Sequence, residues 1–131
     1  MPTLLAVLAV VTEYADTWLR DELRAAWYPS GQAAQLESTL SVRVLFVLGV
    51  NPASASDGSG VTPDSAAVAG EVAANPDVLR VPAVHSAGNE GKSALVHDMW
   101  RALAALHDAQ FYVKAQARAR AACLCAAPAI W

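Results

Sequence analysis

The sequence predicts an α/β fold, with one mainly parallel sheet flanked by helices, and three observations support this prediction. Short apolar runs rich in β-branched residues recur along the chain, and stretches of helical periodicity separate them. Such alternation is typical of parallel sheets whose strands are joined by right-handed crossovers. The length of 131 residues favours a single domain, and a hydrophobic content of 55% is sufficient for a core.

The first half of the chain contains two predicted strands and two predicted helices. Leu4 to Val11 is a continuous apolar run, as expected for a strand buried on both faces. Ala15 to Trp27 has helical periodicity, and Ala33 to Leu40 is a candidate for a second, short helix. Val42 to Val50 is the strongest strand signal because it combines β-branched and aromatic residues. The apolar face of the first helix carries Leu19, Leu23 and Trp27.

The second half repeats this alternation. Asp64 to Ala74 is a short Ala-rich helix, and Val78 to Val84 is the third predicted strand. Pro82 places this strand at an edge of the sheet, or marks its end, because proline donates no hydrogen bond to a ladder. Lys92 to His107 is a long amphipathic helix, and Ala109 to Ala115 is the fourth strand. The apolar side of the long helix carries Leu95, Met99, Leu103 and Leu106.

Charge and motifs exclude several functional classes. The formal net charge of −3 gives no basic excess, so we expect no nucleic-acid partner. The sequence has neither a Gly-x-Gly-x-x-Gly after the first strand nor a P-loop, which argues against a standard dinucleotide or nucleoside triphosphate site. The histidines are twelve and ten residues apart, fit no metal motif and are expected at the surface or in packing: His85, His97 and His107. Three tryptophans on predicted helices are expected in the core: Trp18, Trp27 and Trp100.

Four basic side chains are candidate phosphate contacts. Arg20 and Arg24 lie one helical turn apart, so they form either a cationic fork for a diphosphate or part of a solvated, ion-paired face. Composition alone favours the ion-paired face. Lys92 opens the long helix, where a helix N-terminus attracts anions, and Lys114 ends a strand at the edge where α/β sheets bind ligands. Solvation or pairing with a carboxylate is the alternative for both lysines.

Five segments occur in the order of one family pattern. The first, LRDELRAAWYPSGQAAQLE from Leu19 to Glu37, is similar to Arg-x-x-x-Arg-x-x-Trp-x-Pro-x-Gly followed by Leu-Glu. The last, HDAQFYVKA from His107 to Ala115, is similar to Trp-Asp-Ala-Asp-Phe-Tyr-Val-Lys-Val. Between them lie VRVLFVLG, Glu71 followed by Asp77-Val78-Leu79, and Gly91-Lys92-Ser93. Through these segments the chain resembles glycosyltransferase family 31, the β-1,3-galactosyltransferases, in its plant and green-algal form.

The resemblance implies a GT-A fold, in which a Rossmann-like sheet binds a nucleotide sugar such as UDP-galactose or UDP-N-acetylglucosamine. Members transfer the sugar, with inversion, to a hydroxyl group of a glycan or glycoprotein acceptor. The resemblance assigns the UDP-sugar contacts to Arg20, Arg24, Lys114 and, with less support, Lys92. Members are usually Golgi membrane proteins, and we expect no membrane anchor in this chain because no apolar stretch reaches the roughly 20 residues that span a bilayer.

The chain departs from the family at the metal site. Family members bind Mn²⁺ through three aspartates directly after the fourth strand, and the matching positions here are Gln116, Ala117 and Arg118. None is a carboxylate, and a hard cation needs oxygen ligands. We therefore expect no bound Mn²⁺ and no sugar transfer by this chain.

The expected organisation is a truncated GT-A domain. Residues 1–115 form its nucleotide-sugar-binding half, and residues 116–131 form an irregular low-complexity tail, with the acceptor half and catalytic base of the family lying beyond. Two alternatives remain at this stage: a non-catalytic nucleotide-binding domain, and an unrelated flavodoxin-like domain, which strand order would distinguish.

Overall fold

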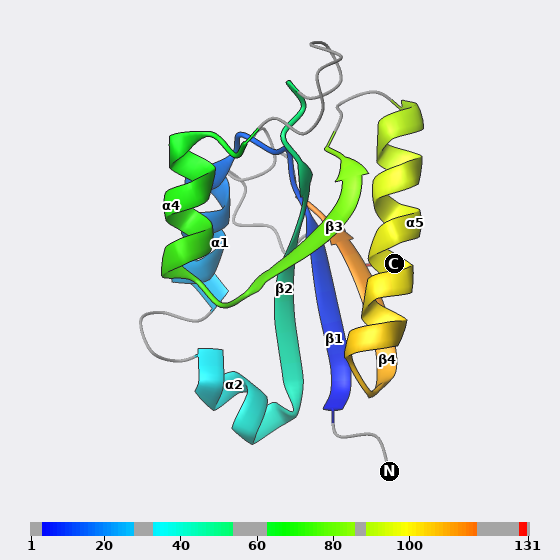
Figure 1. Cartoon of the computed structure of the whole chain (residues 1–131). Helices are drawn as coiled ribbons and strands as arrows, with labels where there is room; N and C mark the ends of the chain where they lie inside the picture. The colour runs from blue at the N-terminus through cyan, green and yellow to red at the C-terminus, as the bar shows by residue number, and fades with distance from the viewer. Residues whose placement is uncertain (1–3, 28–32, 54–62, 86–88, 118–128, 131) are drawn as a thin grey trace.

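The computed structural model describes residues 4–27, 33–53, 63–85, 89–117 and 129–130 (Figure 1). The four predicted strands are present, with bounds that agree with the sequence-based ranges to within one residue. The elements in chain order are β1 (Leu4–Val11), α1 (Thr17–Trp27), α2 (Ala33–Leu40), β2 (Val42–Val50), α4 (Ala66–Ala74), β3 (Val78–Val84), α5 (Asn89–Leu106), β4 (Ala109–Gln116) and β5 (Ala129–Ile130).

The strands form one sheet in the order β3-β2-β1-β4-β5. The first four are mutually parallel and β5 pairs antiparallel with β4, so the prediction of a mainly parallel sheet is confirmed. β3 lies at an edge, as Pro82 indicated. The order 3-2-1-4 is that of a Rossmann-like sheet, whereas a flavodoxin-like sheet has the order 2-1-3-4-5. The flavodoxin-like alternative is therefore wrong.

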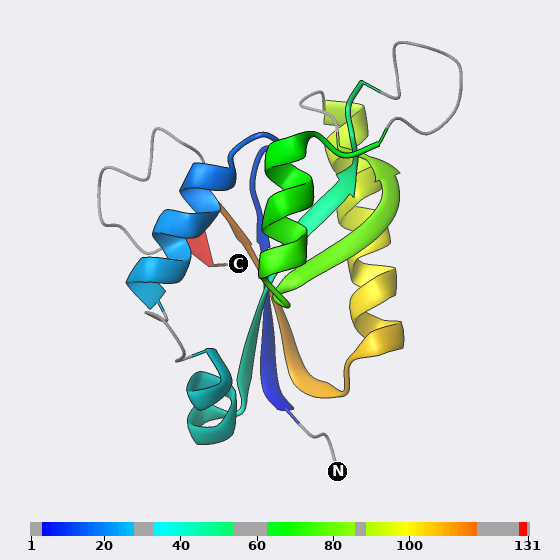
Figure 2. The same cartoon turned by 60° about the vertical axis from the view of Figure 1, so that its left-hand side comes forward.

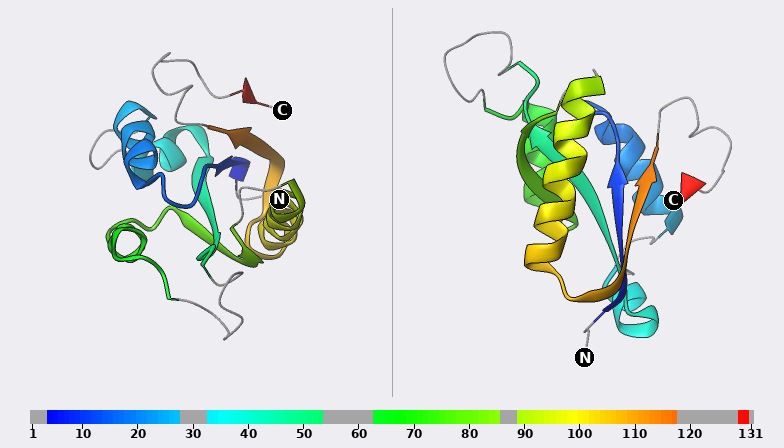
Figure 3. Two further views of the ribbon diagram at one scale, coloured as in Figure 1. Left: turned by 90° about the horizontal axis from the view of Figure 1, so that it is seen from above. Right: turned by 90° about the vertical axis from the view of Figure 1, so that its right-hand side faces the viewer.

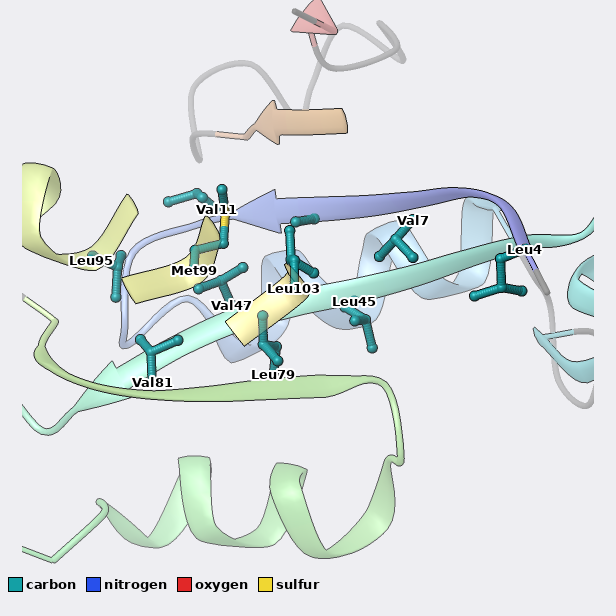
Figure 4. Close-up of a cluster of buried hydrophobic side chains, with 11 residues drawn as sticks. Leu4, Val7, Val11, Leu45, Val47, Leu79, Val81, Leu95, Met99 and Leu103 are labelled. Carbon is teal, nitrogen blue, oxygen red and sulfur yellow. The ribbon is translucent and has the colours of Figure 1, made fainter. Parts of the chain in front are cut away.

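Helices cover the sheet on both faces, with α5 on one side and α1 and α4 on the other (Figures 2 and 3). The strand residues alternate between these two sides because successive side chains of a strand point to opposite faces. On the α5 side, Val7, Leu45 and Val47 pack against the helix in a cluster of eleven buried residues, drawn in Figure 4. On the α1 side, Val10 and Phe46 pack against Leu19 and its neighbours.

Two expectations about helix packing were wrong. Trp18 and Trp100 are 51% and 39% exposed, because each directly neighbours a buried residue on its helix and successive helical side chains point about 100° apart. Leu106 is 67% exposed because it is the last residue of α5, next to the turn into β4. Trp27 does pack as expected, stacked on Phe46 with the ring centroids 6.4 Å apart.

No helix within the described residues combines the length and the apolar character that crossing a bilayer requires.

A candidate nucleotide-binding edge

The carboxyl ends of β1 and β4 meet at the point where the strand order reverses direction. β1 leads into α1 on one face of the sheet, whereas β4 is reached from α5 on the other face (Figure 3). Sheets of this kind bind ligands at such a switch point, outside the carboxyl ends of the strands. The Ala117 N–H donates to the Val11 carbonyl at 3.0 Å. Gln116 and Ala117 therefore lie beside the residues that follow β1.

Arg20 holds the loop that follows β1. Its side chain is fully buried and donates five hydrogen bonds, which is the full donor capacity of a guanidinium group. Two of these bonds, both 2.7 Å long, form a bidentate pair with Glu71 of α4. The other three reach the Thr12 hydroxyl, the Glu13 carbonyl and the Tyr14 carbonyl, at 2.8, 2.7 and 3.0 Å. One arginine thus fixes three successive residues at the candidate edge.

Arg24 extends the same network towards the amino end of β3. It forms a bidentate pair with Asp77, with both distances 2.9 Å, and contacts Glu71 at 3.0 Å and Asp21 at 2.8 Å. Its guanidinium carbon also lies 4.7 Å from the centre of the Phe46 ring. Burial lowers the pKa of Arg24, but the hydrogen bonds that Arg24 donates to Asp77 and Glu71, together with their negative charges, outweigh burial and raise it. Arg24 is therefore a fixed cation in a neutralised, buried cluster.

These two arginines match the sequence-based interpretations only in part, because both are ion-paired, as the favoured interpretation predicted. A solvated face is wrong, because Arg20 is 0% and Arg24 8% exposed. An open fork for a diphosphate does not fit either, because a phosphate would have to displace buried carboxylates from both side chains. Sequence spacing could not reveal this, because the partners Glu71 and Asp77 lie 51 and 53 residues away from Arg20 and Arg24.

The structure does not bring Lys114 together with the arginines. Lys114 is paired across the sheet with Ala9, which belongs to the core on the α5 side. The half-buried lysine therefore lies on the α5 side near the carboxyl end of β4, whereas both arginines lie on the α1 side. Lys92 falls in the first turn of α5, but its side chain lies outside the described residues, as does Arg118.

His85 ties together the carboxyl ends of three strands. Its Nδ1 accepts a hydrogen bond from the Gly49 N–H at 3.2 Å, at the end of β2. Its Nε2 lies 2.7 Å from the Thr12 carbonyl, directly after β1, and the ring packs in a T-shaped arrangement with Tyr14, the centroids 5.8 Å apart. Burial is the main cause that lowers the pKa of His85, and the Thr12 bond opposes it. The prediction of a packing histidine is confirmed here.

Tyr14, Asp64 and Arg80 form a second polar group near this edge, which sequence reasoning missed. The Tyr14 hydroxyl donates to Asp64 at 2.6 Å, and Arg80 of β3 pairs with the same carboxylate oxygen at 3.0 Å. Burial and the bond to Asp64 raise the pKa of Tyr14, and the hydrogen bond from Arg80 lowers the pKa of Asp64. The three residues are far apart in sequence and belong to no motif, so no signal in the sequence could have joined them.

The residues at the family's metal positions do not fit a divalent cation. The side chains of Gln116 and Ala117 supply one neutral oxygen, whereas Mn²⁺ prefers several oxygen ligands, carboxylates among them. Among the residues that the structure describes, no three histidine, cysteine or acidic side chains gather as a metal site would require.

Comparisons with protein-family models, with curated proteins and with solved structures found no match to the chain.

Proposed function

We propose that this chain is a nucleotide-sugar-binding domain of the hexosyltransferase type. It binds the uridine diphosphate of UDP-galactose or UDP-N-acetylglucosamine at the edge where β1 and β4 end. The observation that carries the proposal is the strand order, which sets the end of β4 next to the loop after β1. The family resemblance assigns one diphosphate contact, Lys114, and the positions of the metal triplet to that same end of β4, and switch points of this kind are where α/β sheets bind ligands.

The peptide groups of the loop after β1 are compatible with an anion. The carbonyl oxygens of Thr12, Glu13 and Tyr14 each lie within hydrogen-bonding distance of a buried side chain, His85 for the first and Arg20 for the other two. Unpaired carbonyl oxygens would repel a phosphate, and these three are instead turned towards the side chains of His85 and Arg20. Lys114, from β4, is the cation we assign to the diphosphate, as a point charge near the carboxyl end of the sheet. Arg20 and Arg24 support the site without contacting the ligand.

In this proposal the domain binds the nucleotide without a metal and transfers no sugar. The departing UDP of a hexosyltransferase needs its charge offset, and removing one electrostatic group of this kind typically costs about 3 kcal/mol or more. Gln116 and Ala117 provide no such group. The resemblance also leads us to propose a Golgi location and a glycan or glycoprotein, the acceptor of the family reaction, as the partner.

Isothermal titration with UDP tests the proposal. Lys114→Ala should weaken binding about tenfold or more, because a hydrogen bond to a charged group contributes about 1.5–3 kcal/mol. Arg101→Ala, which removes an exposed cation on α5, is the matched control and should leave the affinity unchanged. Replacing Mn²⁺ by EDTA should also have no effect. No measurable affinity for UDP, or an equal affinity of the Lys114 variant, would overturn the proposal.

A further inference from the structure

We propose that His85 is a positioning residue of this same site, holding the loop Thr12–Tyr14 in its binding geometry only while the imidazole is neutral. This inference rests on the proposed function, because it concerns how the same loop is kept ready for the nucleotide. It adds a consequence that the proposed function does not contain: the affinity for a nucleotide sugar should fall as the pH falls.

The contacts of the ring fix its tautomer. Gly49 offers an N–H group, so the Nδ1 atom 3.2 Å away must be the acceptor. The proton of a neutral ring is then on Nε2, which donates to the Thr12 carbonyl at 2.7 Å. A second proton, on Nδ1, would point at the Gly49 N–H and remove that bond. The neutral ring therefore joins β1 to β2, whereas the charged ring keeps its bond to the Thr12 carbonyl and loses the bond from Gly49.

The surroundings of the ring oppose protonation. His85 is 3% exposed, and desolvation is the largest influence on it. The charged or titratable groups around the ring are Glu13 and Tyr14 of the loop, Arg20 of α1 and Arg80 of β3. Both arginines disfavour a second cation, although each pairs with a carboxylate, whereas the bond to the Thr12 carbonyl and the charge of Glu13 favour one. Protonation must therefore be accompanied by a rearrangement that relieves the buried charge.

A rearrangement at His85 would change the position of the loop Thr12–Tyr14, because two of its residues contact the imidazole ring. Thr12 is held twice, by His85 at its carbonyl and by Arg20 at its hydroxyl, and Tyr14 packs against the imidazole ring. Losing the bridge removes the link from Thr12 through His85 to Gly49 of β2, and the loop is then held by Arg20 of α1 and by the bond from Tyr14 to Asp64. Since the folded state binds this proton less readily than the unfolded state does, the bridge is complete at pH values above about 6.5 and is lost as the pH falls through the pKa of the folded protein.

The test is the pH dependence of UDP-galactose binding, measured by calorimetry between about pH 8 and about pH 5.5. UDP-galactose is the better probe because each of its phosphates is substituted twice and has no second ionisation, whereas the terminal phosphate of UDP itself titrates near about pH 6. The affinity of the wild-type protein should fall by up to about tenfold for each pH unit below the pKa of His85. His85→Gln keeps a donor and an acceptor but does not titrate, so its affinity should be flat over this range.

His97→Gln is the matched control, because the His97 side chain is 70% exposed, and it should keep the wild-type pH dependence. The amide signals of Gly49 and Thr12, followed by NMR without ligand, should titrate together with the His85 ring. Wild-type affinity that is independent of pH, or a His85→Gln variant with the wild-type profile, would overturn the inference and leave the proposed function standing. Absence of binding at every pH would overturn both.

Discussion

At the scale of single residues, Arg20 is the side chain on which the candidate edge most depends. It is fully buried, and its bidentate partner Glu71 is almost as deeply buried. Removing one partner of such a pair leaves an uncompensated charge, which typically destabilises a protein by about 3–5 kcal/mol. We expect Arg20→Met to lower the free energy of unfolding by this amount in urea titrations.

Two variants serve as controls for the Arg20 prediction. Arg20→Met combined with Glu71→Leu should recover the part of the loss that comes from the unpaired Glu71 carboxylate, because apolar residues often replace a buried ion pair at little cost. Asp21→Ala removes a carboxylate that is 65% exposed and pairs with Arg24 within one helical turn, so it should change stability by less than about 1 kcal/mol. A single Arg20 variant as stable as the wild type would show that the pair is not structural.

Two glycines offer a matched pair of substitutions with opposite expected effects. A Cβ atom at Gly49 would lie 2.3 Å from the Ala83 carbonyl oxygen and 3.0 Å from the backbone nitrogen of His85, because β2 and β3 approach closely there. Gly49→Ala should destabilise the protein by about 1–3 kcal/mol through overpacking. A Cβ atom at Gly70 meets nothing within 4 Å, so Gly70→Ala in α4 should stabilise by about 0.5–1 kcal/mol. Thermal unfolding measures both, and equal effects would contradict the close approach.

At the scale of elements, the sequence was sufficient to place the strands and the main helices. Buried parallel strands are continuous apolar runs, so Leu4–Val11 and Val42–Val50 could be delimited from composition alone. The contacts within the site could not be predicted from the sequence. The pairing of Arg20 with Glu71 joins α1 to α4 across 51 residues, and no local pattern encodes it. The face on which Lys114 lies could not be predicted either, because it depends on which strand neighbours β4.

Two leucines in the last turn of α5 differ in how they pack, and their substitution tests this. Leu103 is fully buried against the sheet, whereas Leu106 is 67% exposed, although both lie on the apolar side predicted from spacing. Leu103→Ala should cost about 2–5 kcal/mol of stability, and Leu106→Ala should change it by no more than about 0.5 kcal/mol. Urea unfolding midpoints provide the comparison, and a large loss at Leu106 would mean that the helix end is buried in solution.

At the scale of the whole molecule, the proposal of binding without catalysis can be tested directly. Purified chain, radiolabelled UDP-galactose and Mn²⁺ should give no transfer to galactose, N-acetylhexosamine or hydroxyproline-peptide acceptors, because the positions of the metal triplet hold Gln116, Ala117 and Arg118. The measurement is product formation relative to a heat-killed control. Turnover clearly above that control would show that the acidic triplet is dispensable.

The location of the nucleotide site is tested most directly by NMR, through the backbone amide shifts of the labelled protein during a titration with UDP. We expect the largest shifts at Thr12 and Glu13, after β1, and at Gln116 and Ala117, at the end of β4, since these four residues lie together at the carboxyl edge. Ser41 and Asp108, which hydrogen-bond to the start of β1 at the opposite edge, should not move. Shifts confined to that opposite edge, or no shifts at millimolar UDP, would contradict a nucleotide site between β1 and β4.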